Sequence, residues 1–440
     1  MIPLSTREIA ALTGADAGED VVVRGVSIDS RSVAGGDLFV ALSGARTDGS
    51  VYVEQALAAG AVAALVSREH AGPRRIAVED PLLALGEIAA EVRRRSDAVV
   101  VAVTGSTGKT STKDILHALV APHLATVASR ENENNELGVP LTICRVEPET
   151  GAVIAELAMR GLGQIAYLSR IVQPRIAIIT GIGPVHLELL GSIENVAAAK
   201  AEVLADVEPG GTAVVPHREP LLAPYLGRRE IRVVTFGEED GADVRLDALR
   251  RRSPTEAEAE ITVHGRTITL PVNFTSHHNG LNLAAAVAAY DAAGLPLDEA
   301  GRGSSSVRFS RWRGETLELP GGGLLIADCY NANPTSMRAA ARHLIDVADG
   351  RRTVAVLGDM AEIGEGAEEH HGLLAEDLRN LGIERVVAVG PLSQAYGGDW
   401  FATVDDAVDA LPQLVQPGDA VLVKASRSMG LEAVVEALLP

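Results

Sequence analysis

The sequence predicts an α/β protein with three domains, and three observations carry this prediction. A chain of 440 residues is long enough for two or three domains. Short runs rich in Val, Ile, Leu and Ala alternate with helical patterns, as in parallel sheets with crossover helices. A glycine-rich segment, AVTGSTGKT at 102–110, joins one apolar run to a helical pattern. We expect a small α/β domain over 1–96, a central, mostly parallel sheet over 97–312, and a doubly wound domain over 313–440.

The composition limits the setting in which the chain works. Hydrophobic residues make up 47% of the chain and aromatic residues only 3%, so Ala, Val, Leu and Ile must build the cores. The net charge of −20 argues against binding to nucleic acid or to an anionic membrane surface. The two cysteines form no disulfide framework, and the first residues do not resemble a signal peptide. No uncharged apolar run approaches the roughly 18 residues of a membrane-spanning helix. We therefore expect a cytoplasmic protein without membrane insertion.

The glycine-rich segment has the form of a phosphate-binding loop. Gly105 and Gly108 let backbone N–H groups surround an anion at the start of a helix. Lys109 would reach the outer phosphates of a nucleotide, and the hydroxyl of Thr110 would bind Mg²⁺. Val103 stands where the general motif has its first glycine. The alternative is an ordinary strand-to-helix turn with a surface lysine.

The first domain offers one polar loop, with the sequence Asp-Ser-Arg at 29–31. It lies between strands that we expect at 21–23 and 38–42. Ser30 and Arg31 provide a hydroxyl group and a guanidinium fork, which suit a phosphate or a nucleotide-sugar. The alternative is a polar turn with an exposed ion pair.

Two candidate metal ligands follow apolar strands of the central domain. Glu156 comes near the end of a strand expected at 151–155, and His186 follows one at 175–180. Ligands in open α/β sheets lie beyond the carboxyl ends of strands, so both side chains should point toward the phosphate loop. Carboxylates suit Mg²⁺, whereas histidine is an unusual partner for so hard a cation. Taken singly, either residue could instead be structural.

Lys200 falls on the apolar face of a helix predicted over 192–208. It comes four residues after Val196 and three before Val203, which belong to the apolar stripe of that helix. A buried lysine must find a partner or lose its charge. A neutral amine can react with carbon dioxide to form a carbamate, which would act as a further carboxylate for a metal. The alternative is a lysine whose ammonium group extends to solvent.

The end of the central domain changes to a hairpin pattern with its turn near His264. A polar segment then opens an alanine-rich helix over 283–293. The adjacent His277 and His278 point apart on a helix, which favours polar contacts at the helix start over a metal site. Asn282 either shares these contacts or reads the edge of a base.

The third domain repeats one pattern, an apolar strand followed by a polar or glycine-rich turn. Strands are expected at 324–327, 353–357, 386–389 and 420–423. The corresponding turns lie at 328–334, 358–362, 390–391 and 424–429. Turns of this kind place ligand contacts in a doubly wound domain.

Together these stretches resemble the Mur ligase family over essentially the whole chain. The family's phosphate loop has the form Thr-Gly-x-x-Gly-Lys-Thr, which accounts for Val103. Four more stretches are similar to signatures of members that join D-alanyl-D-alanine to UDP-N-acetylmuramoyl-tripeptide: NENNELGVPLT at 132–142, YNANPTSM at 330–337, LGDMAEIG at 357–364 and KASRSMGLE at 424–432. Three stretches of the first domain, 29–31, 36–42 and 48–49, resemble the family's uridine-nucleotide domain.

The resemblance implies a role for each matching residue. The ATP site would comprise Thr104, Gly105, Ser106, Thr107, Gly108, Lys109, Thr110, Ser111, Asn282, Arg313, Asp328, Asn331 and Asn333. Arg311 is the alternative to Arg313. Two Mg²⁺ ions would be held by Thr110, Glu156, His186 and Lys200, the last as a carbamate, and the catalytic residues would be Lys109, Glu156, His186 and Lys200. Substrate contacts would be Ser30, Arg31, Asn134, Asn135, Lys424, Ser426 and Arg427.

The resemblance further implies a first domain that binds the UDP end of the substrate and a Rossmann-like third domain that binds the dipeptide and closes on ATP. The terminal carboxylate of the tripeptide would attack the γ-phosphate of ATP, and the amine of D-alanyl-D-alanine would then displace phosphate from the acyl phosphate. We expect a monomer. Two alternatives stay open: a related ligase that adds another amino acid, including glutamate to folate, and a nucleotide-regulated binding module.

Overall fold

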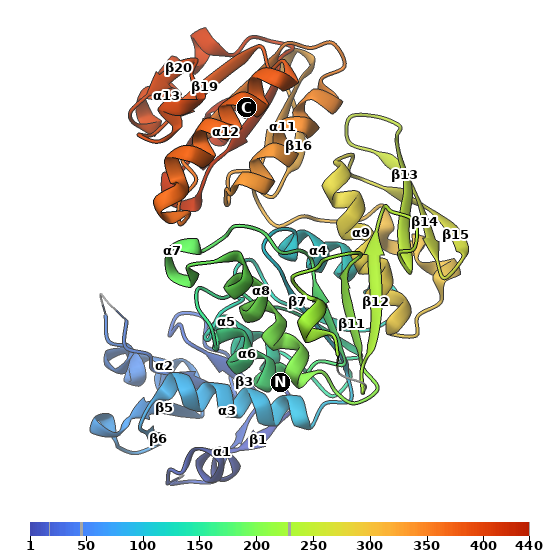
Figure 1. Ribbon diagram of the computed structural model, residues 1–440. Helices are drawn as coiled ribbons and strands as arrows, with labels where there is room; N and C mark the ends of the chain where they lie inside the picture. The colour runs from blue at the N-terminus through green and yellow to red at the C-terminus, as the bar shows by residue number, and fades with distance from the viewer. Residues whose placement is uncertain (17, 45–46, 228–229, 440) are drawn as a thin grey trace.

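The computed structural model describes residues 1–16, 18–44, 47–227 and 230–439. These residues form three large sheets in chain order, from the blue N-terminal part of the molecule to the red C-terminal part (Figure 1). The predicted α/β class is confirmed, since helices and mostly parallel strands alternate along the chain. None of the described helices is both long enough and apolar enough to cross a membrane.

The N-terminal sheet has four parallel strands in the order β3-β4-β5-β6. A separate antiparallel pair joins β1 to β2. The third helix, α3, packs against α5 and α6 of the next sheet, and its Arg93 Nε donates to the carbonyl of Val172 at 2.8 Å. The bounds are β1 (Leu4–Ser5), α1 (Thr6–Thr13), β2 (Val22–Val23), β3 (Gly25–Ser27), β4 (Asp37–Val40), α2 (Val53–Ala59), β5 (Ala63–Ser67), β6 (Arg75–Val78) and α3 (Pro81–Arg94).

The central sheet has nine strands in the order β15-β14-β13-β12-β11-β10-β7-β9-β8. Its strands alternate strictly between two cores: Val100 and Ala102 face α5 and α6, whereas Val101 and Val103 face α4 and α9. The bounds of its first half are β7 (Val99–Thr104), α4 (Lys109–Val120), β8 (Thr126–Ala128), α5 (Gly138–Ile143), β9 (Ala152–Glu156), α6 (Gln164–Val172), β10 (Ile176–Ile179), α7 (Leu187–Leu190) and α8 (Ile193–Ala201).

The second half of this sheet turns antiparallel after β13, which produces the yellow-green extension at the right of Figure 1. The predicted hairpin turn is confirmed, with His264 and Gly265 both at positive φ (48° and 84°), as a tight two-residue hairpin requires. The bounds are β11 (Thr212–Pro216), β12 (Arg232–Gly237), β13 (Val244–Arg251), β14 (Ala257–Val263), β15 (Arg266–Val272), α9 (His277–Ala292) and α10 (Gly301–Ser304). Helix α9 begins six residues before the predicted start at 283.

The helix predicted over 192–208 is shorter in the structure. Helix α8 ends at Ala201, and a 3₁₀ turn, Glu202–Asp206, follows it. The carboxylate of Glu202 accepts from the backbone N–H groups of Gly163 (2.6 Å) and Ala166 (3.0 Å) at the start of α6. The residue at the break thus caps a neighbouring helix, a contact that helical periodicity cannot reveal.

The C-terminal sheet has six strands in the order β16-β17-β21-β18-β19-β20, and β16 is antiparallel to its neighbour. The four predicted strands are confirmed, while the edge strands β16 and β20 were not predicted. Separate cores cover its two faces, one with α11 and α12 and the other with α13 and α14. The bounds are β16 (Glu315–Leu319), β17 (Gly323–Ala327), α11 (Pro334–Ala348), β18 (Thr353–Gly358), α12 (Ala367–Leu381), β19 (Arg385–Val389), β20 (Asp399–Phe401), α13 (Val404–Leu414), β21 (Ala420–Lys424) and α14 (Glu432–Leu438).

Candidate active site

A cavity of about 1170 Å³ lies where the central and C-terminal sheets meet. Residues that are up to 318 positions apart in the sequence line it together, from Ser106 to Lys424. The predicted site residues in its lining are Ser106, Thr107, Gly108, Lys109, Thr110, Ser111, Asn134, Asn135, Glu156, His186, Asn282, Arg313, Asp328, Asn331, Asn333 and Lys424.

The phosphate loop fills the turn between β7 and α4 and needs both of its glycines. Gly105 has φ 149°, and an added Cβ would lie 2.0 Å from Thr180 Oγ1. Gly108 has φ 79°, and an added Cβ would lie 2.4 Å from Asn282 Oδ1. Thr180 also donates from its hydroxyl to the carbonyl of Thr107. The loop is therefore held from both sides, with its backbone at the N-terminus of α4, where an anion is favoured.

Lys109 and Glu156 lie on the same wall of the cavity. Lys109 Nζ donates to the carbonyl of Gly105 at 2.7 Å, and burial lowers its pKa although Glu156 acts in the opposite direction. Glu156 is only 1% exposed, and its Oε1 accepts from Asn134 Nδ2 at 2.9 Å. Its Oε2 is buried without a hydrogen-bond partner among the described residues. A buried carboxylate oxygen without a partner is costly, and this one is free to accept a ligand.

His186 and Lys200 approach the same wall from α7 and α8. His186 precedes α7 with φ 53°, and burial lowers the pKa of its imidazole. Lys200 is 2% exposed, and burial, followed by the positive charge of Lys109, holds its pKa well below the ordinary value. No carboxylate in the described part of the chain lies within 4.0 Å of its Nζ. Lys200 lies behind the cavity wall rather than in the lining.

The donor set fits Mg²⁺ shared with a nucleotide better than a cage made by the protein alone. Within residues 1–16, 18–44, 47–227 and 230–439, no group of three His, Cys, Asp or Glu side chains could hold a metal ion. Mg²⁺ commonly takes one or two protein carboxylates and completes its octahedron with phosphate oxygens and water. The partnerless oxygen of Glu156 and the hydroxyl of Thr110, beside a phosphate loop, match that description.

Residues from the C-terminal sheet complete the opposite wall. The guanidinium of Arg313 lies 3.7 Å from the ring centre of Tyr330, and its Nε is buried without a partner in the part of the chain described. The alternative arginine, Arg311, lies over Trp312 at 5.5 Å and does not line the cavity. The geometry therefore favours Arg313 over Arg311.

Lys424 fixes the loop that carries Asp328. Its Nζ donates to Asp328 Oδ2 at 2.7 Å and to the carbonyl of Asn331 at 2.9 Å, and it is 2% exposed. Asn333 caps α11 by accepting from the N–H of Ser336 at 2.9 Å. These contacts give Lys424 a structural task within the cavity wall.

The remaining predicted residues do not line this cavity. Thr104 is the last residue of β7 and Gly105 begins the phosphate loop, and neither lines the cavity. Arg31 is exposed, and its guanidinium forms two-pronged contacts with Asp29, whose pKa it lowers to about 2. Ser30 lies between Asp29 and Arg31 in the turn that follows β3.

Ser426 and Arg427 are also outside the lining. Ser426 Oγ accepts from the N–H of Ala361, and Arg427 pairs with Glu432 at 2.7 Å. Both side chains are therefore engaged within the C-terminal domain.

Several lining residues escaped the sequence-based prediction, among them Thr180, His278 and His343. The rings of His278 and His343 meet edge to face at 6.3 Å across the two sheets. Burial is the main cause that lowers the pKa of His278 to about 4 and that of His343 to about 3, so both are neutral at pH 7. The HxxxN spacing to Asn282 was the one available signal for His278. His343 lies in another domain and had none.

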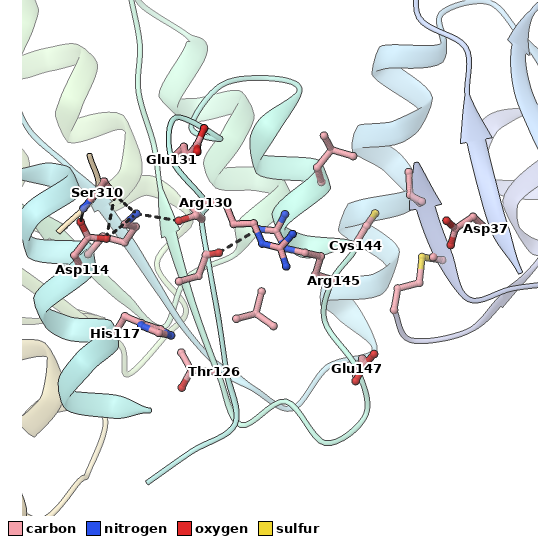
Figure 2. A pocket seen from close by; sticks show the side chains of 18 residues that line it. Asp37, Asp114, His117, Thr126, Arg130, Glu131, Cys144, Arg145, Glu147 and Ser310 are labelled. Carbon is pink, nitrogen blue, oxygen red and sulfur yellow. Dashed lines mark hydrogen bonds and ion pairs between the residues drawn. The ribbon is translucent and has the colours of Figure 1, made fainter. Parts of the chain in front are cut away.

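A second cavity of about 860 Å³ lies between the edge strand β8, α4 and the N-terminal domain (Figure 2). Asp114 and Ser310 meet on one wall, and Arg145 lies on another. Lys113 Nζ lies 2.9 Å from both the carbonyl of Ser129 and Asp114 Oδ1, and Arg145 pairs with Glu133 at 2.7 Å. No described side chain in this lining has a buried polar atom without a partner. Unlike the first cavity, this one therefore offers a ligand no buried polar atom that lacks a described hydrogen-bond partner.

The fold and the larger cavity define a phosphate-loop, nucleotide-binding α/β enzyme whose site is completed by a second sheet. Three family models match the chain: "Mur ligase family, catalytic domain" at residues 22–93, "Mur ligase middle domain" at 103–290, and "Mur ligase, glutamate ligase domain" at 312–427. The chain belongs to the Mur ligase family.

Relatives of known name agree with this assignment. The UDP-N-acetylmuramoyl-tripeptide–D-alanyl-D-alanine ligase of Bacillus subtilis is 33% identical over 96% of this chain and 94% of its own. The ligase of the same name from Escherichia coli is 34% identical over 97% and 96%. Both matches extend over nearly the full length of both proteins.

Solved structures give the same result. MurF from Acinetobacter baumannii superposes with a TM-score of 0.90 at 30% identity, covering 99% of this chain and 98% of its own. MurF from Thermotoga maritima in complex with ADP gives 0.84 at 28% identity, covering 94% and 97%. A folylpolyglutamate synthase from Mycobacterium tuberculosis, at 0.67 and 16% identity, shares the fold alone. The chain is an ATP-dependent ligase that forms amide bonds.

Proposed function

We propose that this chain joins D-alanyl-D-alanine to UDP-N-acetylmuramoyl-tripeptide at the expense of ATP, in the synthesis of peptidoglycan precursors. Relatives that carry this activity in their names match it nearly end to end. The observation that carries the proposal is the larger cavity. There the phosphate loop, Glu156 and Asn282 of the central sheet face Arg313 and Asp328 of the C-terminal sheet.

The proposed reaction forms one amide bond in two steps. A carboxylate oxygen of the tripeptide first attacks the γ-phosphorus of ATP, the bond to the bridging oxygen breaks, and ADP leaves. The amine nitrogen of D-alanyl-D-alanine then attacks the acyl carbon of the acyl phosphate and loses a proton, and inorganic phosphate leaves. Positioning the reactants and neutralising negative charge are the main tasks left to the protein.

The residues of the cavity divide these tasks. Lys109 and the N–H groups of the phosphate loop neutralise the outer phosphates. Asn282, which touches Gly108, would read the adenine edge. Arg313 and Asp328 would complete the nucleotide site from the C-terminal sheet, and Lys424 holds the Asp328 loop in place.

Mg²⁺ would supply further charge neutralisation on the phosphates when bound. Thr110, Glu156 and His186 would hold two ions with the help of a carbamate on Lys200. The carbamate is supported by the burial of Lys200, by its low pKa, and by the lack of a described carboxylate beside it. A neutral buried amine is the form that reacts with carbon dioxide.

The other substrate contacts remain part of the proposal. Ser30 and Arg31 would bind the UDP end, Asn134 and Asn135 the peptide, and Ser426 and Arg427 the dipeptide side of the third domain. Because ATP and the UDP-linked peptide are its substrates, we propose that the enzyme acts in the cytoplasm, and that it does so as a monomer.

A coupled assay of phosphate release tests the proposal directly. Phosphate should appear only when ATP, UDP-N-acetylmuramoyl-tripeptide and D-alanyl-D-alanine are all present. The mass of the product should equal the summed masses of the UDP-linked tripeptide and the dipeptide, less the mass of one water molecule. Glutamate with folate, and a diamino acid with the UDP-muramoyl dipeptide, are the control substrate pairs. Turnover with a control pair in place of the named one would assign the chain to another amide ligase.

A further inference from the structure

The loop between β18 and α12 extends from the C-terminal sheet toward the central sheet, where the side chain of its Glu362 contacts His186. Oε2 of Glu362 lies 2.8 Å from His186 Nδ1, and its Oε1 lies 3.8 Å from Arg160 Nη2. His186 and Arg160 line the active-site cavity, whereas Glu362 does not. One carboxylate therefore contacts two cavity residues from outside the cavity.

Backbone contacts place this loop independently of Glu362. The N–H of Ala361 donates to Ser426 Oγ at 2.8 Å, and the N–H of Met360 donates to His371 Nε2 at 3.1 Å. Gly364, with φ 78°, packs so closely that an added Cβ would lie 3.3 Å from the Cα of Glu188 in α7. Glu362 itself has φ 62°, a left-handed conformation that is uncommon for a residue other than glycine. The loop is thus built to present one side chain at a fixed point.

The Glu362 contact is unsuited to stabilising the fold. The carboxylate side chain is 47% exposed, and exposed ion pairs contribute about 0–1 kcal/mol. Nδ1 of His186 also lacks an aligned hydrogen bond among the described residues, so the contact is close but bent. Catalytic hydrogen bonds often tighten only when substrates bind.

The geometric consequence of the contact concerns the two nitrogens of the imidazole. With Nδ1 against a carboxylate, the proton is favoured on Nδ1 and the lone pair of Nε2 is left to face the site. We propose that Glu362 is a positioning residue, whose carboxylate holds the Nδ1 edge of His186 and so couples docking of the C-terminal sheet to the orientation of an active-site side chain. The kinetic part of this inference rests on the proposed function.

The first test needs neither substrate nor metal. In protein labelled with ¹⁵N-histidine, long-range ¹H–¹⁵N spectra without magnesium or nucleotide report the tautomer of His186, identified by the signal lost in His186→Gln. The wild type should carry the proton on Nδ1. Glu362→Ala should shift the population toward Nε2–H, and Glu362→Gln, which keeps an accepting oxygen, should retain most of the Nδ1–H form. Glu368→Gln, an exposed glutamate in the first turn of α12, is the matched control and should change nothing.

The second test separates orientation from a merely structural role. Loss of a carboxylate that orients a metal-binding histidine costs about 10–100-fold in activity or metal affinity. Glu362→Ala should therefore lower kcat by about that factor, with little change in the KM for ATP or in Tm. In a His186→Gln background the same change should have no further effect, because the two residues act in series.

Two results would overturn the inference. One is a tautomer and a kcat for Glu362→Ala that equal those of Glu368→Gln. The other is an effect of Glu362→Ala that persists in full without His186. Should the wild type lack the proposed ligase activity, the tautomer measurement would still decide the contact.

Discussion

The two cavities differ in how far their polar groups are already satisfied. Apart from His186, whose Nδ1 lies against Glu362, four side chains that line the larger cavity have a buried polar atom without a described partner: Glu156, His217, Arg313 and His343. The smaller cavity, drawn in Figure 2, has none among its described lining residues, where Lys113 pairs with Asp114 and Arg145 pairs with the nearby Glu133. Buried polar groups are normally hydrogen-bonded, so open valences that gather in one place point to a ligand. Volume alone, 1170 against 860 Å³, would not separate the two.

Helix α4 contributes a lysine to each cavity, one turn apart. Lys109 lines the larger cavity and, among the described residues, its ammonium group bonds only to its own loop, at the carbonyl of Gly105. Lys113 lines the smaller one and pairs with Asp114 and the carbonyl of Ser129. We therefore expect Lys109 to act in the reaction and Lys113 to stabilise the fold. Substituting each lysine in turn can separate these two roles.

Lys109→Met should produce the largest effect on activity. Removing one preorganised donor from a site of developing charge costs about 10²–10³-fold in kcat. Because Lys109 has no ion pair to lose in the described part of the chain, Tm should stay within the error of the wild type. Steady-state phosphate release and a thermal melt measure both quantities, and a kcat within threefold of the wild type would remove Lys109 from the proposed site.

Lys200→Ala should nearly abolish turnover as well, with one distinguishing feature. If a carbamate supplies a metal ligand, a small carboxylate such as formate or acetate should enter the vacated space and restore part of the activity. Chloride at equal ionic strength is the control salt. Full turnover without added carboxylate would exclude the carbamate, and loss without rescue by any small carboxylate would leave Lys200 a structural lysine.

Much of this site could be predicted from the sequence, because its signals are local. The glycines before Lys109 and the position of Glu156 at the end of a buried strand each fix a side chain relative to its own strand. Contacts between distant segments left no such signal. Thr180 braces the phosphate loop, and Glu362 reaches His186, only because the fold brings them there.

The predicted helix around Lys200 shows the same limit. The apolar stripe correctly indicated a buried lysine, since Lys200 is 2% exposed. The stripe could not indicate that the helix ends at Ala201, or that the carboxylate of the next residue, Glu202, accepts from backbone N–H groups at the start of α6. The sequence also could not show that the hydroxyl of Ser426, which we expect on the dipeptide side of the site, accepts from the N–H of Ala361.

Lys113→Met should act on stability more than on catalysis. The change leaves Asp114 and the carbonyl of Ser129 without their cation, and an unsatisfied buried group costs about 1–3 kcal/mol. Asp114 keeps the N–H of Ser310 as a donor at 2.8 Å, which favours the lower end of that range. Denaturant unfolding should shift to lower concentration while kcat of the folded enzyme stays within a few-fold. A loss of kcat comparable to that of Lys109→Met would mean that the smaller cavity also serves the reaction.

Arg31→Ala should have the smallest effect on stability. It extends the comparison of the two cavities to the Asp29–Arg31 pair of the N-terminal domain. Arg31 already has an ion-pair partner in Asp29, as Lys113 and Arg145 of the smaller cavity have theirs. We nevertheless propose that Arg31 contacts the UDP end of the substrate, because it lies in the first domain. Without Arg31, the pKa of Asp29 should rise from about 2 toward its ordinary 3.8, so the carboxylate would become protonated at higher pH than in the wild type. The pairing is complete at pH 7 and its contribution to stability is lost only as the pH falls toward about 2, but because the pair is exposed that contribution is small, and Tm at pH 7 should change little.

Binding is the readout that decides between the two interpretations of Arg31. If the guanidinium leaves Asp29 to contact the diphosphate, the KM for the UDP-linked substrate should rise about tenfold, the equivalent of about 1.4 kcal/mol, while the KM for ATP stays constant. The control is Arg7→Ala, which removes another exposed arginine of the same domain whose partner, Asp20, lies 3.8 Å away. Equal KM values for Arg31→Ala and Arg7→Ala would leave Arg31 as half of a surface ion pair, satisfied as fully as the charges of the smaller cavity.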